Sequence, residues 1–308
     1  MNKEELIMLQ SLPLDIKIAK SKLRIQEWID YWGKNKVYVS FSGGKDSTVL
    51  LHLVRQVLKD VPAVFCDTGL EFPEIKEFVN SKKNVVTLRP KLSFKQVIEK
   101  YGYPMISKEQ AFYLELIRHS KSEKTRNKAL NGDKNGNFHL SKKYQYLIDA
   151  PFDISNHCCK VMKKDPARRY EWDTGRKPFI GTLASESMLR RQSYMKSGCN
   201  AFDSLRPHST PLGFWTEQDI LQYIYTKRIK ICSVYGKVVK EGDIYKTTLR
   251  DRTGCIYCGF GAQYEDCPNR YQKLELTHPQ LHEYCMNKLG FKEVCEYMGI
   301  PYTNKEEE

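Results

Sequence analysis

Long apolar runs are missing from this sequence of 308 residues. No stretch approaches the roughly 18 consecutive apolar residues that a membrane-spanning helix needs. The N-terminal residues 1–17 mix acidic and basic side chains and lack an apolar core followed by a small-residue cleavage site, so they do not match a secretory signal. Internal repeats are also absent. These absences predict a globular cytoplasmic protein with no membrane partner.

Ten cysteines and an excess of positive charge narrow the classes further. A reducing cytoplasm keeps thiols free, so ten cysteines are more typical of metal ligands or redox groups than of structural disulfides. The formal charge of +13 favours anionic partners, either nucleotides or nucleic acid. A Lys-rich surface also arises from solubility alone, so charge leaves a nucleic-acid partner open.

Strand-like and helix-like segments alternate from residue 36 onward. A β-prone run at 36–41 is followed by a Gly-Gly turn and by residues 46–59, whose apolar positions share one helical face. Further strands are expected at 63–66, 84–88 and 179–183, and further helices at 73–82 and 93–101. This alternation predicts an α/β fold with a doubly wound, mostly parallel, Rossmann-like sheet covered on both faces.

The regions around this core differ from it in pattern. Residues 1–32 have apolar positions at helical spacing with a break at Pro13, and predict two leading helices. The expected divisions are 1–32, a nucleotide-binding domain at 33–205, and a smaller, Cys-rich, mainly helical C-terminal region at 206–308.

A basic insertion is expected at about 118–143. Eight Lys or Arg there stand against one Glu and one Asp. The segment is either a solvated surface loop or arm, or a segment that contacts the phosphates of a nucleic acid or nucleotide.

The loop Ser42–Ser47, with the sequence Ser-Gly-Gly-Lys-Asp-Ser, has the residue types of a phosphate site. Small residues between a strand and a helix leave backbone N–H groups unpaired at the positive end of the helix dipole. Gly43 and Gly44 permit close approach of the backbone. The serines add hydroxyl donors, and Lys45 adds a charge that can follow charge developing on a leaving phosphate.

Asp46 can either cap the helix or help to hold Mg²⁺. A simple Gly-Gly turn capped by Asp46 is the alternative for the whole loop, but it leaves the serines and Lys45 unexplained. The Walker spacing G-x-x-x-x-G-K-S/T is absent.

The loop resembles the SGGKDS signature of the PP-loop ATP pyrophosphatases, also called adenine nucleotide alpha hydrolases. The resemblance implies that ATP with Mg²⁺ is bound and broken between its α and β phosphates. Residues 67–74 resemble the D-T-G-x-x-F-x-E stretch of the phosphoadenylylsulfate (PAPS) reductase and sulfate adenylyltransferase branch, although a polar turn before a helix is the alternative. The residues expected to bind the nucleotide are Ser40, Ser42, Gly43, Gly44, Lys45, Asp46, Ser47, Asp67 and Gly181.

Four cysteines form two close pairs, Cys158-Cys159 and Cys255-x-x-Cys258. Four thiolates are a full ligand set for Zn²⁺ or for an iron-sulfur cluster, and adjacent cysteines are unusual for a zinc ribbon. A tandem pair followed by a distant C-x-x-C resembles the 4Fe-4S site of adenylylsulfate (APS) reductases. Free or redox thiols are the remaining alternative, with Cys267 as another ligand or a reactive thiol.

Two further residues are expected at the catalytic site beside Lys45 and Asp46. Lys163 matches a lysine that such reductases place between cluster and nucleotide, and Arg190 ends a segment from Gly181 that resembles a nucleotide-approaching stretch of the reductases. The alternatives are a solvated lysine for the first and an ordinary strand-to-helix connection for the second.

Departures from the reductases decide between three hypotheses. The chain lacks their C-terminal E-C-G-L-H tail, and Leu183 and Ala184 stand where they carry arginines, whereas the loop Ser42–Ser47 is intact. The leading hypothesis is an ATP-dependent, iron-sulfur-dependent sulfurtransferase that adenylates an acceptor, with a sulfur donor and a nucleic-acid acceptor such as tRNA or DNA. The second is an APS or PAPS reductase served by a thioredoxin-like protein, and the third is a non-enzymatic module that senses nucleotide and cluster.

Overall fold

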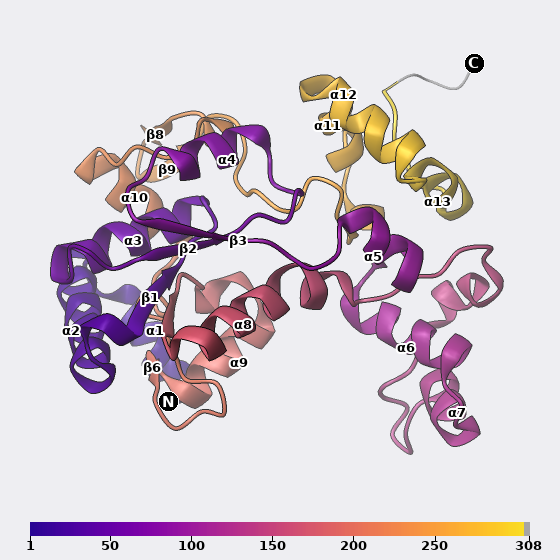
Figure 1. Ribbon diagram of the computed structural model, residues 1–308, viewed down its shortest axis with the longest axis horizontal. Coiled ribbons are helices and arrows are strands. Elements are labelled where there is room, and N and C mark those ends of the chain that lie inside the picture. The colour runs from indigo at the N-terminus through magenta and orange to yellow at the C-terminus, as the bar shows by residue number, and fades with distance from the viewer. Residues whose placement is uncertain (305–308) are drawn as a thin grey trace. The chain divides into compact units, whose positions relative to one another are not determined.

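The computed structural model describes residues 1–304, and the charged tail Lys305–Glu308 lies outside the described residues (Figure 1). The chain forms two compact units. Unit 1 contains Met1–Asp67, Glu71–Arg89 and Pro166–Thr253, and unit 2 contains Thr68–Leu70, Pro90–Asp165 and the residues from Gly254 onward. These units interleave along the chain, whereas the divisions expected from the sequence are continuous.

Unit 1 is built on a six-stranded sheet with the order β3-β2-β1-β5-β7-β6. Every neighbouring pair is parallel except β6 with β7. The mostly parallel α/β sheet predicted from the sequence is therefore confirmed. The strands of the sheet are β1 (Val37–Ser40), β2 (Ala63–Cys66), β3 (Val85–Leu88), β5 (Lys177–Ile180), β6 (Asn200–Ala201) and β7 (His208–Ser209), and a separate hairpin joins β8 (Val238–Glu241) and β9 (Ile244–Thr247). The helices are α1 (Lys3–Ser11), α2 (Leu14–Trp32), α3 (Lys45–Val57), α4 (Pro73–Asn80), α8 (Asp165–Thr174), α9 (Met188–Ser197) and α10 (Glu217–Lys227), with short turns η1 (Lys34–Lys36), η4 (Ala184–Glu186) and η5 (Ser233–Tyr235).

Helices cover both faces of this sheet (Figure 1). On one face, Tyr38 of β1 and Val64 of β2 pack with Tyr170 of α8. Successive strand residues point to opposite faces, and Phe179 of β5 pairs with the residue after Tyr38. The ring of Phe179 lies 6.4 Å from that of Trp28 on α2, which covers the second face.

The two leading helices form as predicted, with Pro13 between them. Lys17 on α2 is buried and forms an ion pair with Asp219 of α10, with 2.6 Å between Nζ and Oδ2. The same carboxylate accepts a hydrogen bond from the backbone N–H of Thr216, the N-cap residue of α10. Losing one partner of a buried pair costs several kcal/mol, so this contact fixes the start of α10, where Glu217 lies.

Unit 2 is mainly helical. Its helices are α5 (Phe94–Tyr101), α6 (Lys108–His119), α7 (Glu123–Asn131), α11 (Arg270–Thr277), α12 (Pro279–Glu283) and α13 (Phe291–Met298). Its strands β4 (Met105–Ile106) and β10 (Gly259–Phe260) form a parallel pair, and its other turns are η2 (Lys142–Asp149), η3 (Lys160–Lys164), η6 (Ala262–Tyr264) and η7 (Tyr284–Lys288).

The basic segment 118–143 is mostly exposed, but part of it is helical and not loop. It contains the end of α6 and all of α7. Ala129 and Leu140 are buried, and the N–H of Leu140 donates to the carbonyl of Ala129 at 2.8 Å. These two apolar anchors stabilise the segment, and its many charges concealed them in the sequence.

Replacing Gly43 by Ala is expected to destabilise the protein more than the same change at Gly242. Both glycines have positive φ, 74° and 59°, so each Ala bears a backbone cost of roughly 1 kcal/mol. A Cβ on Gly43 would also lie 2.9 Å from Ile75 Cγ2, whereas one on Gly242 meets nothing within 4 Å. Overpacking adds about 1–3 kcal/mol.

Urea unfolding of the two variants measures this difference. Equal losses of unfolding free energy would show that α4 yields to the added methyl group and that the packing argument is wrong.

Candidate functional site

The loop Ser42–Ser47 lies at the point where the chain reverses its direction across the sheet. Strand β1 has β2 on one side and β5 on the other, and ligands of such sheets bind at the carboxyl ends of the strands beside this reversal. Gly181 follows β5, and a Cβ there would lie 3.3 Å from the carbonyl oxygen of Asp46 and from the backbone nitrogen of Ser47. The structure thus brings Gly181 against the loop, and the close approach explains why a glycine is used.

Hydroxyl groups close the loop on itself. The Oγ atoms of Ser42 and Ser47 lie 3.1 Å apart, and the N–H of Gly44 donates to Ser42 Oγ at 3.3 Å. Gly44 is the N-cap residue of α3, so the loop lies at the positive end of that helix. Ser40, the last residue of β1, is exposed just before the loop.

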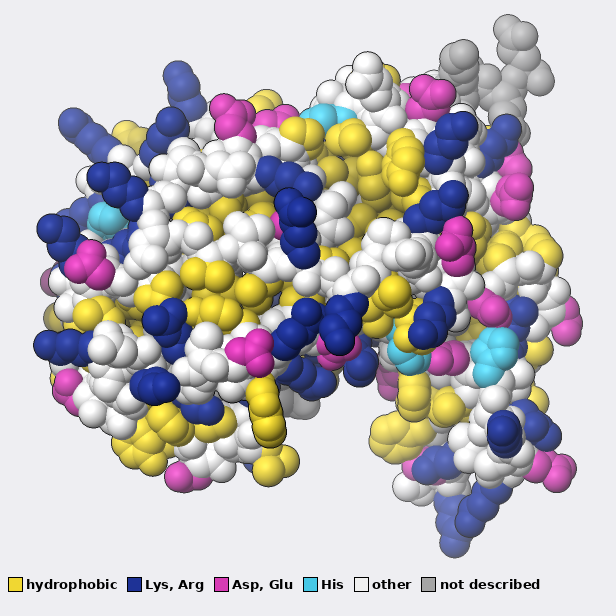
Figure 2. Space-filling model, viewed as in Figure 1, with side chains coloured by type: hydrophobic (Ala, Val, Ile, Leu, Met, Phe, Trp, Pro, Cys, Tyr) yellow, Lys and Arg dark blue, Asp and Glu magenta, His cyan; other side chains and the backbone are white. Residues whose placement is uncertain are grey.

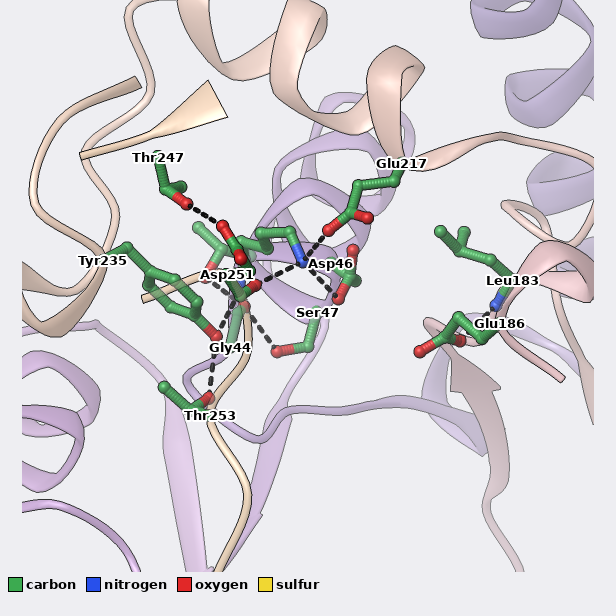
Figure 3. A network of polar contacts seen from close by, with 12 residues as sticks. Gly44, Asp46, Ser47, Leu183, Glu186, Glu217, Tyr235, Thr247, Asp251 and Thr253 are labelled. Carbon is green, nitrogen blue, oxygen red and sulfur yellow. Dashed lines mark hydrogen bonds and ion pairs between the residues drawn. The ribbon is translucent and has the colours of Figure 1, made fainter. Parts of the chain in front are cut away.

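Lys45 is the most constrained charge of the loop. Only 3% of the residue is exposed. Its Nζ lies 3.0 Å from Glu217 Oε1, 3.0 Å from the carbonyl oxygen of Asp251 and 3.7 Å from Asp46 Oδ2. Figure 3 shows Glu217 and Asp251 approaching Asp46 and Gly44 of the loop from different elements. The charge is therefore shared among three oxygens before any ligand binds.

A tyrosine holds the backbone of the same residue. The N–H of Lys45 donates to the hydroxyl of Tyr235 at 3.3 Å, and that hydroxyl lies 2.7 Å from Thr253 Oγ1 (Figure 3). Such an N–H at a helix start is a donor suited to a phosphate oxygen. In this structure a phenol oxygen takes that place.

Asp46 lies beside this cluster and is mostly buried, with 25% of its side chain exposed. Burial raises the pKa of its carboxyl group and the charge of Glu217 raises it further, while Lys45 and Arg252 lower it. Its Oδ1 atom is buried and has no hydrogen-bond partner among the residues that the structure describes. A carboxylate oxygen with spare coordination fits Mg²⁺, which takes one or two carboxylates and completes its shell with phosphates and water.

A cavity of about 130 Å³ opens between the loop and the segment after β5. Its lining combines two cations with three carboxylates: Lys45, Asp46, Leu183, Ser185, Glu186, Glu217 and Arg252. A mixed lining of this kind suits an anionic ligand that arrives with a divalent cation.

Arg190 belongs to a second cavity of about 220 Å³ in the same unit, whose lining also includes His208. Its guanidinium pairs with Glu186. Burial lowers the pKa of Arg190, the nearby Arg252 lowers it further, and Asp46 opposes this. The predicted Arg190 therefore lies within the electrostatic neighbourhood of the loop.

Asp67 follows β2 at the same edge of the sheet. Its carboxylate pairs with Lys76 of α4 at 2.8 Å and lies 3.9 Å from Arg89. These contacts anchor the start of the D-T-G stretch to unit 1.

The segments that carry the two cysteine pairs both bond to one short stretch of unit 2, residues 103–106. On one side, the N–H of Ser155 donates to the carbonyl of Tyr103, just before Cys158-Cys159. On the other side, β10 pairs with β4 directly after Cys258. Segments about a hundred residues apart thus flank the same backbone.

Cys158 is buried, whereas Cys159, Cys255 and Cys258 are partly exposed. Burial raises its pKa, the charges of Cys159, Cys255 and Cys258 raise it further, and Lys163 lowers it. Lys163 lies in the π-helical turn η3, a type of turn frequent at functional sites. Within residues 1–304, however, no group of three or more His, Cys, Asp or Glu side chains is arranged to hold a metal ion. The donor set suits a cluster, but its arrangement is looser than ligation requires.

Sequence reasoning missed Glu217, Tyr235, Asp251 and Thr253. Glu217, Tyr235 and Asp251 contact Lys45 from positions about 170 to 206 residues further along the chain, and Thr253 contacts the hydroxyl of Tyr235. No local pattern marks them, because their role exists only in the folded sheet.

Known proteins share this arrangement of motifs. The family model of the phosphoadenosine phosphosulfate reductase domain matches residues 36–132 and 108–259, which is more than half of the chain. The chain belongs to this family. None of the helices within residues 1–304 has the length and apolar character needed to cross a bilayer.

Relatives in this family differ in how much of their length they share. One uncharacterized protein of Methanocaldococcus jannaschii is 42% identical over 29% of this chain and 23% of its own length. A second uncharacterized protein of the same organism is 25% identical over 73% of this chain and 36% of its own length. This chain thus matches about a quarter to a third of their length. An adenosine 5'-phosphosulfate reductase of a Geobacillus strain is 24% identical over 68% of this chain and 72% of its own length.

Two solved structures are similar over most of the chain. The PAPS reductase of Candida auris in a phosphate complex has a TM-score of 0.39 at 15% identity, covering 76% of this chain and 90% of that one. The U34-tRNA thiolase NcsA of Methanococcus maripaludis with its 4Fe-4S cluster has a TM-score of 0.38 at 14% identity, covering 94% and 82%.

Replacing Asp46 by Asn is expected to raise the melting temperature at neutral pH. Because folding raises the pKa of Asp46, its ionised form destabilises the folded state. That cost is absent below the ordinary aspartate pKa of about 4, grows as the pH rises to the folded-state pKa, and is complete above it. The gain from Asp46→Asn should therefore shrink as the pH falls.

Thermal melts across this pH range, with Asp60→Asn as control, measure the effect. Asp60 is an exposed aspartate beyond the far end of α3. A lower melting temperature for Asp46→Asn than for the control at neutral pH would show that the pair with Lys45 outweighs the cost of burial.

Proposed function

We propose that this protein binds ATP with Mg²⁺, cleaves it between the α and β phosphates, and adenylates an acceptor that then receives sulfur. The observation that carries the proposal is the buried Lys45 at the start of α3, beside the cavity lined by Asp46, Glu186 and Arg252. Its three oxygen partners are groups that a phosphate with its metal ion can replace. Membership of the PAPS reductase domain family supports a sulfur-linked nucleotide enzyme.

In this proposal the loop holds the leaving group. The N–H groups at the start of α3 and the amine of Lys45 bind the β and γ phosphates, while Asp46 supplies a carboxylate oxygen for Mg²⁺. An acceptor oxygen attacks the α phosphorus, and the bond from that phosphorus to the bridging oxygen breaks. The electron pair leaves with pyrophosphate, whose charge Lys45 and the helix dipole stabilise.

Sulfur transfer completes the reaction. Hydrosulfide from the donor attacks the acceptor carbon whose oxygen carries the adenylate, and AMP leaves with that oxygen. We expect Gly181 and Arg190 to act near the α phosphate, because Gly181 approaches the loop and Arg190 pairs with Glu186 of the cavity lining. We further propose a nucleic acid, tRNA or DNA, as the acceptor, because the chain carries a formal charge of +13.

Lys45→Ala is expected to lower the rate of pyrophosphate release from Mg-ATP by about 100-fold or more, since removing one preorganised charge contact costs about 3 kcal/mol in the transition state. The assay uses anaerobically purified protein with and without bulk tRNA or DNA. Lys59→Ala, an exposed lysine just beyond the other end of α3, should match the wild type. Sulfite from APS or PAPS without any pyrophosphate from ATP would falsify this proposal.

We also propose that Cys158, Cys159, Cys255 and Cys258 hold a 4Fe-4S cluster, with Zn²⁺ as the alternative. All four belong to one unit, and the charges of the other three act on Cys158. When bound, such a cluster would supply a site for sulfide or for electrons. Lys163 would then offset its negative charge.

Cluster binding is tested by anaerobic reconstitution with iron and sulfide. Cys158→Ser or Cys255→Ser should lower bound iron at least several-fold, while Cys199→Ser, a buried cysteine of unit 1, should not. Iron content, acid-labile sulfide and visible absorbance report the result independently of activity. Equal iron in all three variants, or zinc in its place, would contradict the iron-sulfur assignment.

A second candidate function is an APS or PAPS reductase. The relatives named adenosine 5'-phosphosulfate reductase favour it. In that reaction a thiolate, with the exposed Cys267 as candidate, attacks the sulfur of the sulfonucleotide and releases the nucleotide. A thiol of a thioredoxin-like partner then attacks the cysteine sulfur and frees sulfite. Sulfite formation that depends on Cys267 distinguishes this function from the first.

A further inference from the structure

A stripe of lysines runs along the segment 121–128 of unit 2. Lys121, Lys124 and Lys128 are spaced by three and four residues, so they lie on one face of α7 and the turn before it. All three are exposed, and none forms a salt bridge with a described residue. By contrast, Arg118 and His119 of α6 both pair with Asp153. The stripe is therefore unneutralised charge that the fold does not use.

An aromatic side chain is held out beside this stripe. Phe138 is 58% exposed, and Lys128 Nζ lies 5.9 Å from the centre of its ring. Its φ is +61°, a conformation that is strained for a bulky residue. The loop that presents it is ordered by Asp133, whose Oδ1 accepts hydrogen bonds from the N–H groups of Asn135 and Asn137. Strain of this kind is found often at functional sites.

A second basic and aromatic pair lies in the same unit. Lys143 Nζ is 2.8 Å from the hydroxyl of Tyr264 and 4.8 Å from the centre of its ring, and Tyr264 is 61% exposed. Tyr264 also contacts the hydroxyl of the buried Tyr144. Tyr264 follows Cys258 by six residues in the sequence, so the Cα atoms of these two residues are at most about 21 Å apart.

The composition of this surface discriminates among partners. Lysine is depleted at protein–protein interfaces, whose centres are apolar. A membrane-surface helix needs an apolar face, and the exposed positions of α7 hold Glu, Lys, Arg and Asn. Lysines between exposed aromatic rings match sites where bases stack and phosphates pair. Figure 2 shows Lys and Arg side chains gathered over α7.

We propose that unit 2 binds unpaired nucleotides of a nucleic acid through Lys121, Lys124, Lys128 and Phe138, with Lys143 and Tyr264 as a second contact point. The bases stack on Phe138 and Tyr264, and the lysines pair with phosphates. A duplex hides the faces of its bases, so the exposed rings select single-stranded segments. Strand binding itself does not depend on the proposed function. Only the identification of the bound strand as the acceptor rests on the proposed function.

Fluorescence anisotropy of the whole protein, without ATP, tests the surface. The probes are labelled RNA and DNA strands of about 12 nucleotides, each single-stranded and as a duplex. Single strands should bind more tightly than duplexes, and the RNA and DNA arms identify which acid is preferred. The doubly substituted Lys124→Gln, Lys128→Gln protein should reduce the slope of log affinity against log salt by about 1.4.

Phe138→Gly separates binding from folding. It removes the ring and relieves the positive φ, so the melting temperature should stay equal or rise while single-strand affinity falls about 5-fold or more. Phe138→Trp should retain affinity. Trp172→Ala removes a ring that is 89% exposed in unit 1 and should leave binding unchanged.

Unaltered affinity in Phe138→Gly, equal binding of duplexes, or preference for anionic vesicles over nucleic acid would overturn the inference. Lys45→Ala should bind single strands like the wild type, because Lys45 belongs to unit 1. Pyrophosphate release without strand binding would refute this surface and leave ATP cleavage standing. Strand binding without pyrophosphate release would support this surface and refute ATP cleavage.

Discussion

Burial of the Lys45 charge at the start of α3 is the constraint on which unit 1 depends. A buried ammonium is stable only where oxygens replace its water, and here they come from the loop itself, from Glu217 of α10 and from the carbonyl of Asp251. The last contact spans 206 residues of sequence. The ion pair of Lys17 with Asp219 in turn fixes α10. The two lysines therefore link α2, α10, the loop before α3 and the segment after β9.

The same contacts set the energetics of ligand binding. Phosphate oxygens compete with Glu217 and Asp251 for the amine of Lys45, and with the hydroxyl of Tyr235 for its backbone N–H. Binding is thus an exchange of partners, in which the ligand gains only the difference between two sets of hydrogen bonds. Asp46 contributes in the opposite direction, because its buried Oδ1 lacks a partner among the described residues and a metal ion would supply one. At Asp46 the side chain that suits metal binding lowers the stability of the fold, a trade-off that is common at functional sites.

Much of the fold was predictable because its signals are local. The strand 63–66 forms as predicted, Pro13 separates the first helices, and the loop with Gly181 lies at the expected edge of the sheet. The partners of Lys45 were not predictable, since nothing near Glu217 or Asp251 in the sequence marks a contact across the fold. The helix α7 was missed for another reason: its charged residues outnumber the two apolar anchors that fold it. The four cysteines were grouped by their spacing, but the segment 103–106, to which both flanking stretches bond, has no chemical signature.

The interleaving of the two units shows why function cannot be assigned by cutting the chain in order. A boundary near residue 205 would separate the loop from α10, which supplies Glu217. It would also separate the loop from residues 247–253, which supply Asp251 and Thr253, the partner of Tyr235. It would also separate Cys158 and Cys159 from Cys255 and Cys258. Unit 1 is complete only when the chain returns to it after Asp165, and unit 2 only when the chain returns after Thr253. Each candidate site therefore requires the full passage of the chain, and the chemistry of one unit is fixed by residues that follow the other in sequence.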